Sequence, residues 1–192
     1  MTRIIAGFAG STNLDVPRSG TRPTSDRVRE ALFSALEARD EIRGLRVVDL
    51  YAGTGALGLE AASRGASQVI LVENAPQAAR VCRTNAALVT ARAPRGTAPF
   101  IDVANQSVRA FLQHTSPGSI DLAFIDPPYE LDGDELARDL LALAPLLAPE
   151  ALVVVERRAS GGEPTWPPGL TLESKKAYGD TLLWLARAAT PA

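Results

Sequence analysis

Five short apolar runs, separated by helix-like segments, constrain the fold of this chain more than any other feature of its sequence. The runs are 46–51 (RVVDLY), 68–72 (QVILV), 100–103, 120–125 and 151–156 (ALVVVE). Helices are predicted between them over about 57–64, 76–91, 107–114 and 134–143. Strands that are apolar throughout are buried on both faces, and their alternation with helices is typical of a parallel sheet. The sequence therefore predicts a doubly wound α/β fold.

Both ends of the chain extend this core. Residues 3–20 alternate weakly and are punctuated by glycine and proline, which predicts a short hairpin or arm. An amphipathic helix follows from about Asp26, with Thr24 or Ser25 as its cap. Its predicted buried face consists of Val28, Ala31, Leu32, Ala35 and Leu36. At the other end, 170–176 and 181–186 predict an antiparallel hairpin, so we expect one domain over 1–192, with the arm and helix in 1–43 and the core in 44–192.

Composition excludes several classes of protein. No apolar run is long enough to span a bilayer. The apolar stretch at the N-terminus is too short for a secretory signal, so we expect a cytoplasmic protein. A single cysteine cannot form an internal disulfide, and with a single histidine it makes no metal cluster. The net charge of −2 argues against nucleic-acid binding by the whole surface but leaves local basic patches open.

A glycine-rich segment follows the first predicted strand. Residues 53–58 (GTGALG) match G-x-G-x-x-G, and Glu73 follows Gly53 at the spacing of a ribose-binding acid, which alone permits a nicotinamide dinucleotide. Asp49, however, lies just before the glycines, where a carboxylate would repel a pyrophosphate and attract an ammonium group. S-adenosylmethionine has an ammonium group, an adenosine and no phosphate, so we expect it as the cofactor. The alternatives are that Asp49 caps the turn and that Glu73 merely starts a helix.

A second motif follows the fourth apolar run. Asp126-Pro127-Pro128-Tyr129 combines a carboxylate, a stiff corner and an aromatic ring at the end of a buried strand. Neither proline has an N–H, so the backbone must leave the sheet there with its carbonyls turned away from the strand pairing. Such carbonyls beside a carboxylate and a ring suit a flat ligand that carries an amine. The alternative is an ordinary proline turn.

Four short segments, which occur in order between residues 22 and 181, resemble the RsmD family of bacterial methyltransferases, and the resemblance covers essentially the whole chain. They are 22–33 (RPTSDRVREALF), 49–60 (DLYAGTGALGLE), 126–129 (DPPY) and 178–181 (YGDT). The resemblance implies a Rossmann-like class I S-adenosylmethionine-dependent methyltransferase fold, with the cofactor-binding and catalytic core in 44–192. It implies methylation of the exocyclic N2 amine of one guanine in small-subunit (16S) ribosomal RNA.

Site residues follow from the resemblance position by position. Those expected to bind the cofactor are Asp49, Tyr51, Gly53, Gly55, Glu73, Asn74, Gln106, Ser107 and Asp126. Asp126, Pro127, Pro128 and Tyr129 are expected to receive the target amine. The chain departs from the family in two places: Gln106-Ser107 stands where an Asp-Ala pair is common, and 10–13 (GSTN) stands where relatives often carry a basic run. A glutamine carbonyl can still accept a hydrogen bond from the adenine amine.

Arginines near the N-terminus are the expected RNA contacts. They are Arg3, Arg18, Arg22, Arg27 and Arg29. We expect them to bind phosphates, with local ion pairs to Asp26 and Glu30 as the alternative. The expected partner is 16S rRNA within an assembling small subunit; no membrane, metal or oligomer is expected. Competing functions are amino-methylation of another nucleic acid, such as adenine N6, a nicotinamide oxidoreductase, and a non-catalytic ribosome-assembly factor with the same fold.

Overall fold

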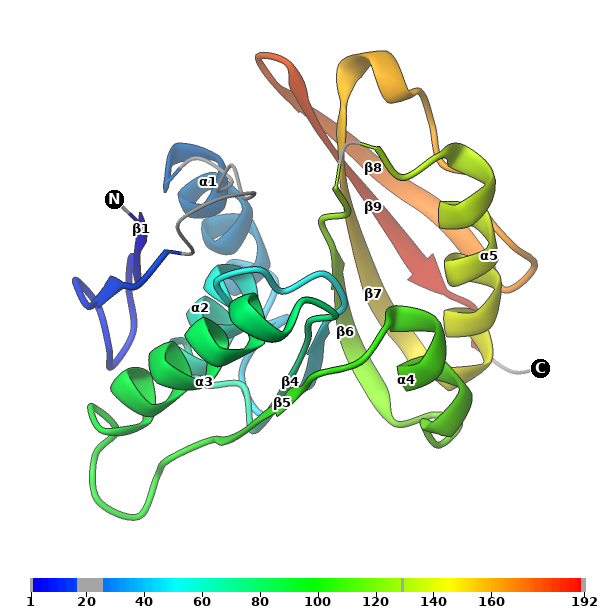
Figure 1. Cartoon of the computed structure of the whole chain (residues 1–192). Coiled ribbons are helices and arrows are strands. Elements are labelled where there is room, and N and C mark those ends of the chain that lie inside the picture. The colour runs from blue at the N-terminus through cyan, green and yellow to red at the C-terminus, as the bar shows by residue number, and fades with distance from the viewer. Residues whose placement is uncertain (1, 17–25, 129, 191–192) are drawn as a thin grey trace.

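The computed structural model describes residues 2–16, 26–128 and 130–190 (Figure 1). Its helices are α1 (Asp26–Glu37), α2 (Ala56–Ser63), α3 (Pro76–Thr90), α4 (Val108–His114) and α5 (Gly133–Leu143), with short 3₁₀ turns at Ala144–Leu146 and Ala159–Gly161. Its strands are β1 (Thr2–Arg3), β2 (Asn13–Leu14), β3 (Arg46–Asp49), β4 (Gln68–Val72), β5 (Phe100–Ala104), β6 (Ile120–Ile125), β7 (Leu147–Arg158), β8 (Leu170–Tyr178) and β9 (Thr181–Ala188). No helix in these ranges is long and apolar enough to cross a membrane.

Seven strands form the main sheet in the order β5-β4-β3-β6-β7-β9-β8. The pairs β5–β4, β4–β3, β3–β6 and β6–β7 are parallel, whereas β9 runs antiparallel to both β7 and β8. The predicted mostly parallel sheet with a C-terminal antiparallel hairpin is therefore confirmed. The order reverses between β4 and β6, on either side of β3, so the sheet opens a crevice at its carboxyl edge there.

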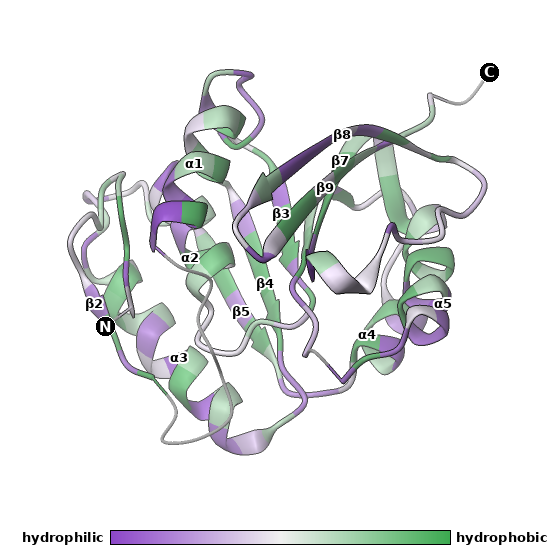
Figure 2. Ribbon diagram, turned by 90° about the horizontal axis from the view of Figure 1, so that it is seen from above, coloured by the Kyte–Doolittle hydropathy of each residue, from purple (hydrophilic) through white to green (hydrophobic). Residues whose placement is uncertain are grey.

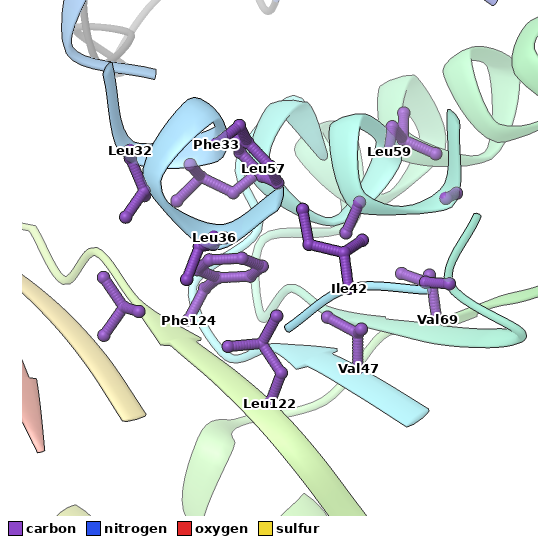
Figure 3. Close-up of a cluster of buried hydrophobic side chains, with 14 of the residues drawn as sticks. Leu32, Phe33, Leu36, Ile42, Val47, Leu57, Leu59, Val69, Leu122 and Phe124 are labelled. Atoms are coloured by element: carbon purple, nitrogen blue, oxygen red, sulfur yellow. The ribbon is translucent and has the colours of Figure 1, made fainter. Parts of the chain in front are cut away.

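Helices cover both faces of the sheet because successive strand residues point in opposite directions. In β6, Leu122 and Phe124 pack with α1, α2 and α3, and Ala123 and Ile125 pack with α4 and α5. Figure 3 shows the first of these cores, where Phe33 of α1 meets Phe124 with ring centroids 5.5 Å apart. The two cores hold the strand ends, and hence the loops beyond them, in a fixed arrangement.

Three details differ from the sequence prediction. Strand β3 ends at Asp49, two residues before the predicted end at Tyr51. Beyond it, the N–H groups of Leu50 and Ala52 still donate to the carbonyls of Phe124 and Val72 on the neighbouring strands. Strand β7 begins four residues earlier than predicted, at Leu147, through an irregularity that places Glu150 at a φ of +61°. In α1, Ala31 and Ala35 are only partly buried.

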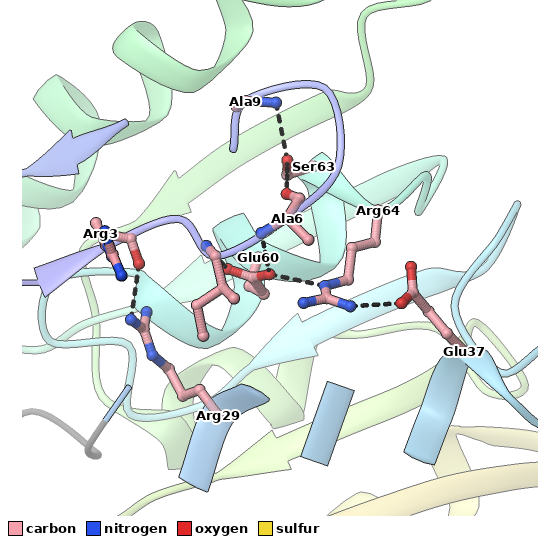
Figure 4. A network of polar contacts seen from close by, with 9 residues as sticks. Arg3, Ala6, Ala9, Arg29, Glu37, Glu60, Ser63 and Arg64 are labelled. Atoms are coloured by element: carbon pink, nitrogen blue, oxygen red, sulfur yellow. Dashed lines mark hydrogen bonds and ion pairs between the residues drawn. The ribbon is translucent and has the colours of Figure 1, made fainter. Parts of the chain in front are cut away.

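The N-terminal arm is tied to helix α2 by a buried polar network (Figure 4). The N–H groups of Ile5 and Ala6 donate to the two carboxylate oxygens of Glu60, at 2.6 and 3.0 Å. Arg64 donates its Nε to the same carboxylate at 2.7 Å and its Nη1 to Glu37 on α1. Glu60 is fully buried, so these partners offset the cost of taking its charge out of water. The arm, α1 and α2 thus form one unit.

Gly7 lies where the arm crosses α2, so a substitution there tests whether the arm packs against this helix. It has a φ of +79°, and a Cβ there would lie 1.9 Å from the Ser63 carbonyl oxygen. We expect Gly7→Ala to lower the free energy of unfolding by the left-handed penalty of about 1–2 kcal/mol plus roughly 1–3 kcal/mol for the clash. Gly44→Ala is the matched control, because Gly44 has a φ of +76° and nothing within 4 Å of the added Cβ. Equal losses in urea denaturation would show that the arm is not packed against α2.

Candidate active site

A cavity of about 1090 Å³ opens at the carboxyl edge of the sheet. Its floor is made by residues that follow β3, β4 and β6, and its far wall by α4 and α5. The site residues predicted from sequence that line it are Asp49, Tyr51, Gly53, Glu73, Asn74, Ser107, Asp126, Pro127 and Pro128. A volume at the upper end of the range for small-molecule pockets leaves room for two ligands side by side.

Asp49, the last residue of β3, is a buried carboxylate with one oxygen unpartnered. Its Oδ2 accepts a hydrogen bond from the Gly58 N–H at 3.0 Å, so the predicted capping alternative is confirmed for that oxygen. Its Oδ1 is buried without a hydrogen-bond partner in the part of the chain that the structure describes. Burial, together with the charges of Asp126 and Glu73, raises the pKa of Asp49 to about 7, although the hydrogen bond from the Gly58 N–H acts in the opposite direction. A cation in the cavity would satisfy this group.

Glu73, which follows β4, turns its carboxylate toward the glycine loop. Its Oε2 accepts from the Gly53 N–H at 2.9 Å, and its Oε1 accepts from the Ala75 N–H at 2.7 Å. Asn105, just beyond β5, holds this segment by donating its Nδ2 to the Glu73 and Asn74 carbonyls, at 2.8 and 3.0 Å. Sequence reasoning missed Asn105, although a polar residue at a strand end signals it. A carboxylate can still accept further hydrogen bonds from hydroxyl groups.

The three glycines of the loop have different roles. Gly53 has a φ of 54° and lines the cavity, which suits close approach of a ligand. Gly55, with a φ of 81°, is buried below the loop, where an added Cβ would lie 3.0 Å from Leu71. At Gly58 an added Cβ would lie 2.3 Å from the same side chain. Gly55 and Gly58 thus allow close packing of α2 against β4; Gly55 is not among the described residues that line the cavity, and its contact with the cofactor stays a prediction.

The loop that begins at Asp126, which we call the catalytic loop after its expected role, follows β6 directly. Asp126, Pro127 and Pro128 line the cavity beside Asp49, and Tyr129 lies outside the described residues. The Pro128 carbonyl accepts from the Leu131 N–H at 3.0 Å, which closes the turn. The proline turn predicted as the alternative is therefore present, and it holds the Asp126 carboxylate at the same cavity as Asp49 and Glu73.

Tyr51 and Ser107 line the side of the cavity toward α4 and α5. The Tyr51 hydroxyl donates to Asp139 of α5 at 2.5 Å, and burial together with this carboxylate raises the pKa of Tyr51. Asp139 was missed, because nothing in an amphipathic helix marks one acid as inward-facing. Ser107 Oγ accepts from the Ala110 N–H and caps α4. Gln106 is not among the described residues that line the cavity, so its contact with adenine stays a prediction.

Comparisons with known proteins agree over nearly the whole chain. A family model described as "Conserved hypothetical protein 95" matches residues 2–187. The chain is 38% identical over 179 residues to Ribosomal RNA small subunit methyltransferase D of Escherichia coli strain K12, covering 92% of this chain and 85% of the relative. The chain belongs to the RsmD family. A Haemophilus influenzae protein of the same name is 37% identical, over 92% of this chain and 89% of the relative. The solved structure of a protein titled putative methyltransferase yhhF from Escherichia coli is 31% identical, with a TM-score of 0.83 and 99% of both chains covered.

In this member of the RsmD family, the N-terminal arginines have unequal surroundings. Arg29 is fully buried and donates its Nη2 to the Arg3 carbonyl and to Asp26, both at 2.7 Å. The predicted RNA contact at Arg29 is therefore corrected to a local ion pair, the alternative that the sequence left open. Arg3 also pairs with Asp26 at 3.6 Å, and Arg27 is exposed on α1. Arg18 and Arg22 lie outside the described residues.

Proposed function

We propose that this protein methylates small-subunit ribosomal RNA with S-adenosylmethionine as the methyl donor, and that its target is the exocyclic N2 amine of a guanine. The observation that carries the proposal is the convergence of Asp49, Glu73 and Asp126, from three different strand ends, on one cavity large enough for a cofactor and a base. The names of the Escherichia coli and Haemophilus influenzae relatives support ribosomal RNA as the substrate.

The charges of the cavity fit this cofactor better than a dinucleotide. In dinucleotide-binding folds, the loop and helix N–H groups bind a pyrophosphate. Here the Gly53 and Gly58 N–H groups already donate to the carboxylates of Glu73 and Asp49. Asp49 Oδ1 is positioned to face an ammonium group, and Glu73 to accept from ribose hydroxyls. When bound, S-adenosylmethionine supplies an electrophilic methyl group on a positively charged sulfur.

Asp126 and Pro127 prepare the target amine. The lone pair of an exocyclic amine is delocalised into the base, which makes it a weak nucleophile. Hydrogen bonds from its N–H groups to the Asp126 carboxylate and the Pro127 carbonyl would favour a pyramidal nitrogen and direct the lone pair toward the cofactor. As the N–C bond forms, that nitrogen must lose a proton, and Asp126 is the group placed to accept it. Holding both reactants in line would supply most of the acceleration. Tyr129 is expected to stack on the base.

Methyl transfer from labelled S-adenosylmethionine into small-subunit RNA tests the proposal. The RNA is taken from cells that lack this protein, both naked and within subunits, and its nucleosides are then separated. Labelled N2-methylguanosine is the expected product. Labelled N6-methyladenosine would instead assign the enzyme to adenine, and no incorporation by a protein that binds the cofactor would support a non-catalytic assembly factor.

Glu73 provides a separate test of the cofactor site. Glu73→Gln keeps the side-chain length but replaces two ionised acceptor oxygens with one neutral acceptor and a donor. We expect the dissociation constant of S-adenosylmethionine to rise roughly 10–100-fold, as for loss of charged hydrogen bonds to ribose hydroxyls. Asp102→Asn is the matched control, because Asp102 is exposed on the neighbouring β5 and outside the cavity lining. Calorimetry that gives the same affinity for both variants would remove Glu73 from the site.

A further inference from the structure

Four basic residues lie toward the ends of two C-terminal strands, on both faces of the sheet, at the carboxyl edge that carries the cavity. Arg157 and Arg158 end β7, and Lys175 and Lys176 lie in β8. We call these four residues the hairpin patch. The segments 156–158 and 174–180 contain only two acids, Glu156 and Asp180, against these four cations, in a chain whose net charge is −2.

Strand register places the hairpin patch beside the catalytic loop. Ile125, the residue before Asp126, pairs with Val155 of β7, which pairs with Trp184 of β9, which pairs with Lys175. Neighbouring strands lie about 4.8 Å apart, so Lys175 is about 14 Å across the sheet from Ile125. Arg157 and Arg158 extend β7 beyond the level of Asp126. The patch thus lies on strands to one side of β6, whose end carries Asp126; Figure 1 shows β7, β9 and β8 on that side.

Three residues of the patch are exposed and Arg157 is half-buried, and two of the side chains rest against neighbouring groups. Lys175 and Lys176 are exposed, and Lys175 Nζ lies 4.6 Å from the ring centroid of Trp184. The guanidinium group of Arg157 lies against Gly161. Within the described part of the chain, these three cations form no ion pair, since Glu173 of β8 is engaged by Arg39 and Arg187. Figure 2 shows β8 as a hydrophilic strand on the outside of the sheet.

The structure leaves fewer N-terminal cations for RNA than the sequence predicted. Arg29 is buried, and Arg3 pairs with Asp26. An RNA substrate brings one negative charge with every nucleotide, and binding requires cations near the target. We propose that the hairpin patch binds the RNA phosphates that flank the target nucleotide. This inference rests on the proposed function, and it assigns RNA docking to the C-terminal strands β7 and β8 rather than to the N-terminal arm.

Neutralising three cations of the patch tests the inference. In the variant Arg157→Gln/Lys175→Gln/Lys176→Gln, we expect the dissociation constant for naked small-subunit RNA to rise roughly tenfold, as three charge contacts are lost. The slope of log K against log salt should become shallower by about 2, or about 0.7 for each contact with single-stranded RNA. Affinity for S-adenosylhomocysteine, the demethylated product of the cofactor, should not change, because none of the three lines the cavity.

The matched control removes three exposed arginines at the opposite edge of the sheet, in Arg43→Gln/Arg92→Gln/Arg95→Gln. These residues precede β3 and β5, far along the strands from the cavity. Equal RNA affinity and equal salt slope for the two triple variants would overturn the inference. So would a loss confined to RNA–protein particles, which would assign the patch to a protein of the particle. If the wild-type protein bound the RNA but transferred no methyl group, the proposed function would be contradicted. The RNA affinities of the two triple variants would still decide whether the patch binds RNA.

Discussion

Replacing Asp126 with asparagine is expected to slow methyl transfer roughly 10²–10³-fold, the usual cost of removing one positioned electrostatic group from an active site. Asparagine occupies the same space after β6, so the turn that Pro127 and Pro128 impose should persist. Its amide, however, cannot accept the proton that the target nitrogen loses and is a weaker acceptor for the amine. Asp126→Ala should reduce transfer further, because it removes the acceptor altogether.

Single-turnover transfer with both substrates saturating measures this effect apart from binding. Asp126 lines the cavity without being the group expected to bind ribose or ammonium, so the affinity for S-adenosylhomocysteine should stay within a few fold. Asp132→Asn is a suitable control, because Asp132 lies a few residues further along and caps α5 through the Glu135 N–H, away from the chemistry. Normal turnover by Asp126→Asn would remove this carboxylate from the mechanism.

The sheet could be predicted because its signal is local. Runs such as 120–125 and 68–72 are apolar throughout, and the structure begins and ends strands β6 and β4 at those residues. The start of β7 could not be predicted in the same way. It includes Pro149 and Glu150, which are not typical strand residues; Glu150 has a positive φ, and Leu147 pairs with Ile120 of the neighbouring strand across an irregularity in the register.

In helix α1, the spacing of apolar residues predicts only part of the buried surface. The pattern predicted one buried face, and Leu32 and Leu36 do lie in the core. Phe33 and Arg29, one turn apart, are also fully buried: Phe33 packs on Phe124 of β6, and Arg29 donates to the Arg3 carbonyl of the N-terminal arm, which covers a second side of the helix. That arm is held by Glu60, a contact across 55 residues that no short-range pattern reveals. Arg29 therefore looked like a surface cation.

Some polar residues of the candidate site could be predicted from the local sequence, and others depend on tertiary packing. Asp49 and Glu73 could be predicted because each ends or follows an apolar strand, and the ends of parallel strands share one edge of the sheet. Asp139 could not, because it faces the cavity only through the packing of α5 near α4 and its bond to Tyr51. The sequence thus predicts the site residues at the strand ends, whereas the residues that α4 and α5 contribute to the cavity wall can be identified only from the structure.

The buried carboxylate of Asp49 makes stability and cofactor binding respond to pH in opposite directions. Its pKa is about 7 in the folded protein, against about 3.9 in an unfolded chain. Between these values the folded protein holds a proton that the unfolded chain has lost, so stability falls as pH rises through this window. The proposed contact with the ammonium group of the cofactor needs the ionised form of Asp49, so affinity should fall as pH drops below about 7. Asp126 and Glu73 share the cavity, and both favour the protonated form of Asp49.

Asp49→Asn should therefore separate the two properties. We expect the variant to lose roughly 10²-fold or more in affinity for S-adenosylmethionine, as when one partner of a buried charge pair is removed. Its affinity should also no longer vary with pH near 7. The same variant should be more stable than the wild type by about 1–4 kcal/mol at pH 8, with a smaller difference at pH 5, since it carries no buried charge. Urea denaturation and calorimetry at several pH values measure both effects.

Asp121→Asn supplies a control of opposite sign on the same sheet. Hydrogen bonds from Arg46 hold the pKa of Asp121 below its ordinary value, so its contribution is present at neutral pH and is lost as pH falls through that lowered pKa. Asp121→Asn should destabilise the protein at pH 8, and the difference should vanish in acid, with cofactor affinity unchanged. If Asp49→Asn were destabilising at pH 8 in the same way, the Asp49 carboxylate would be a structural ion rather than a group kept under strain for a cationic ligand.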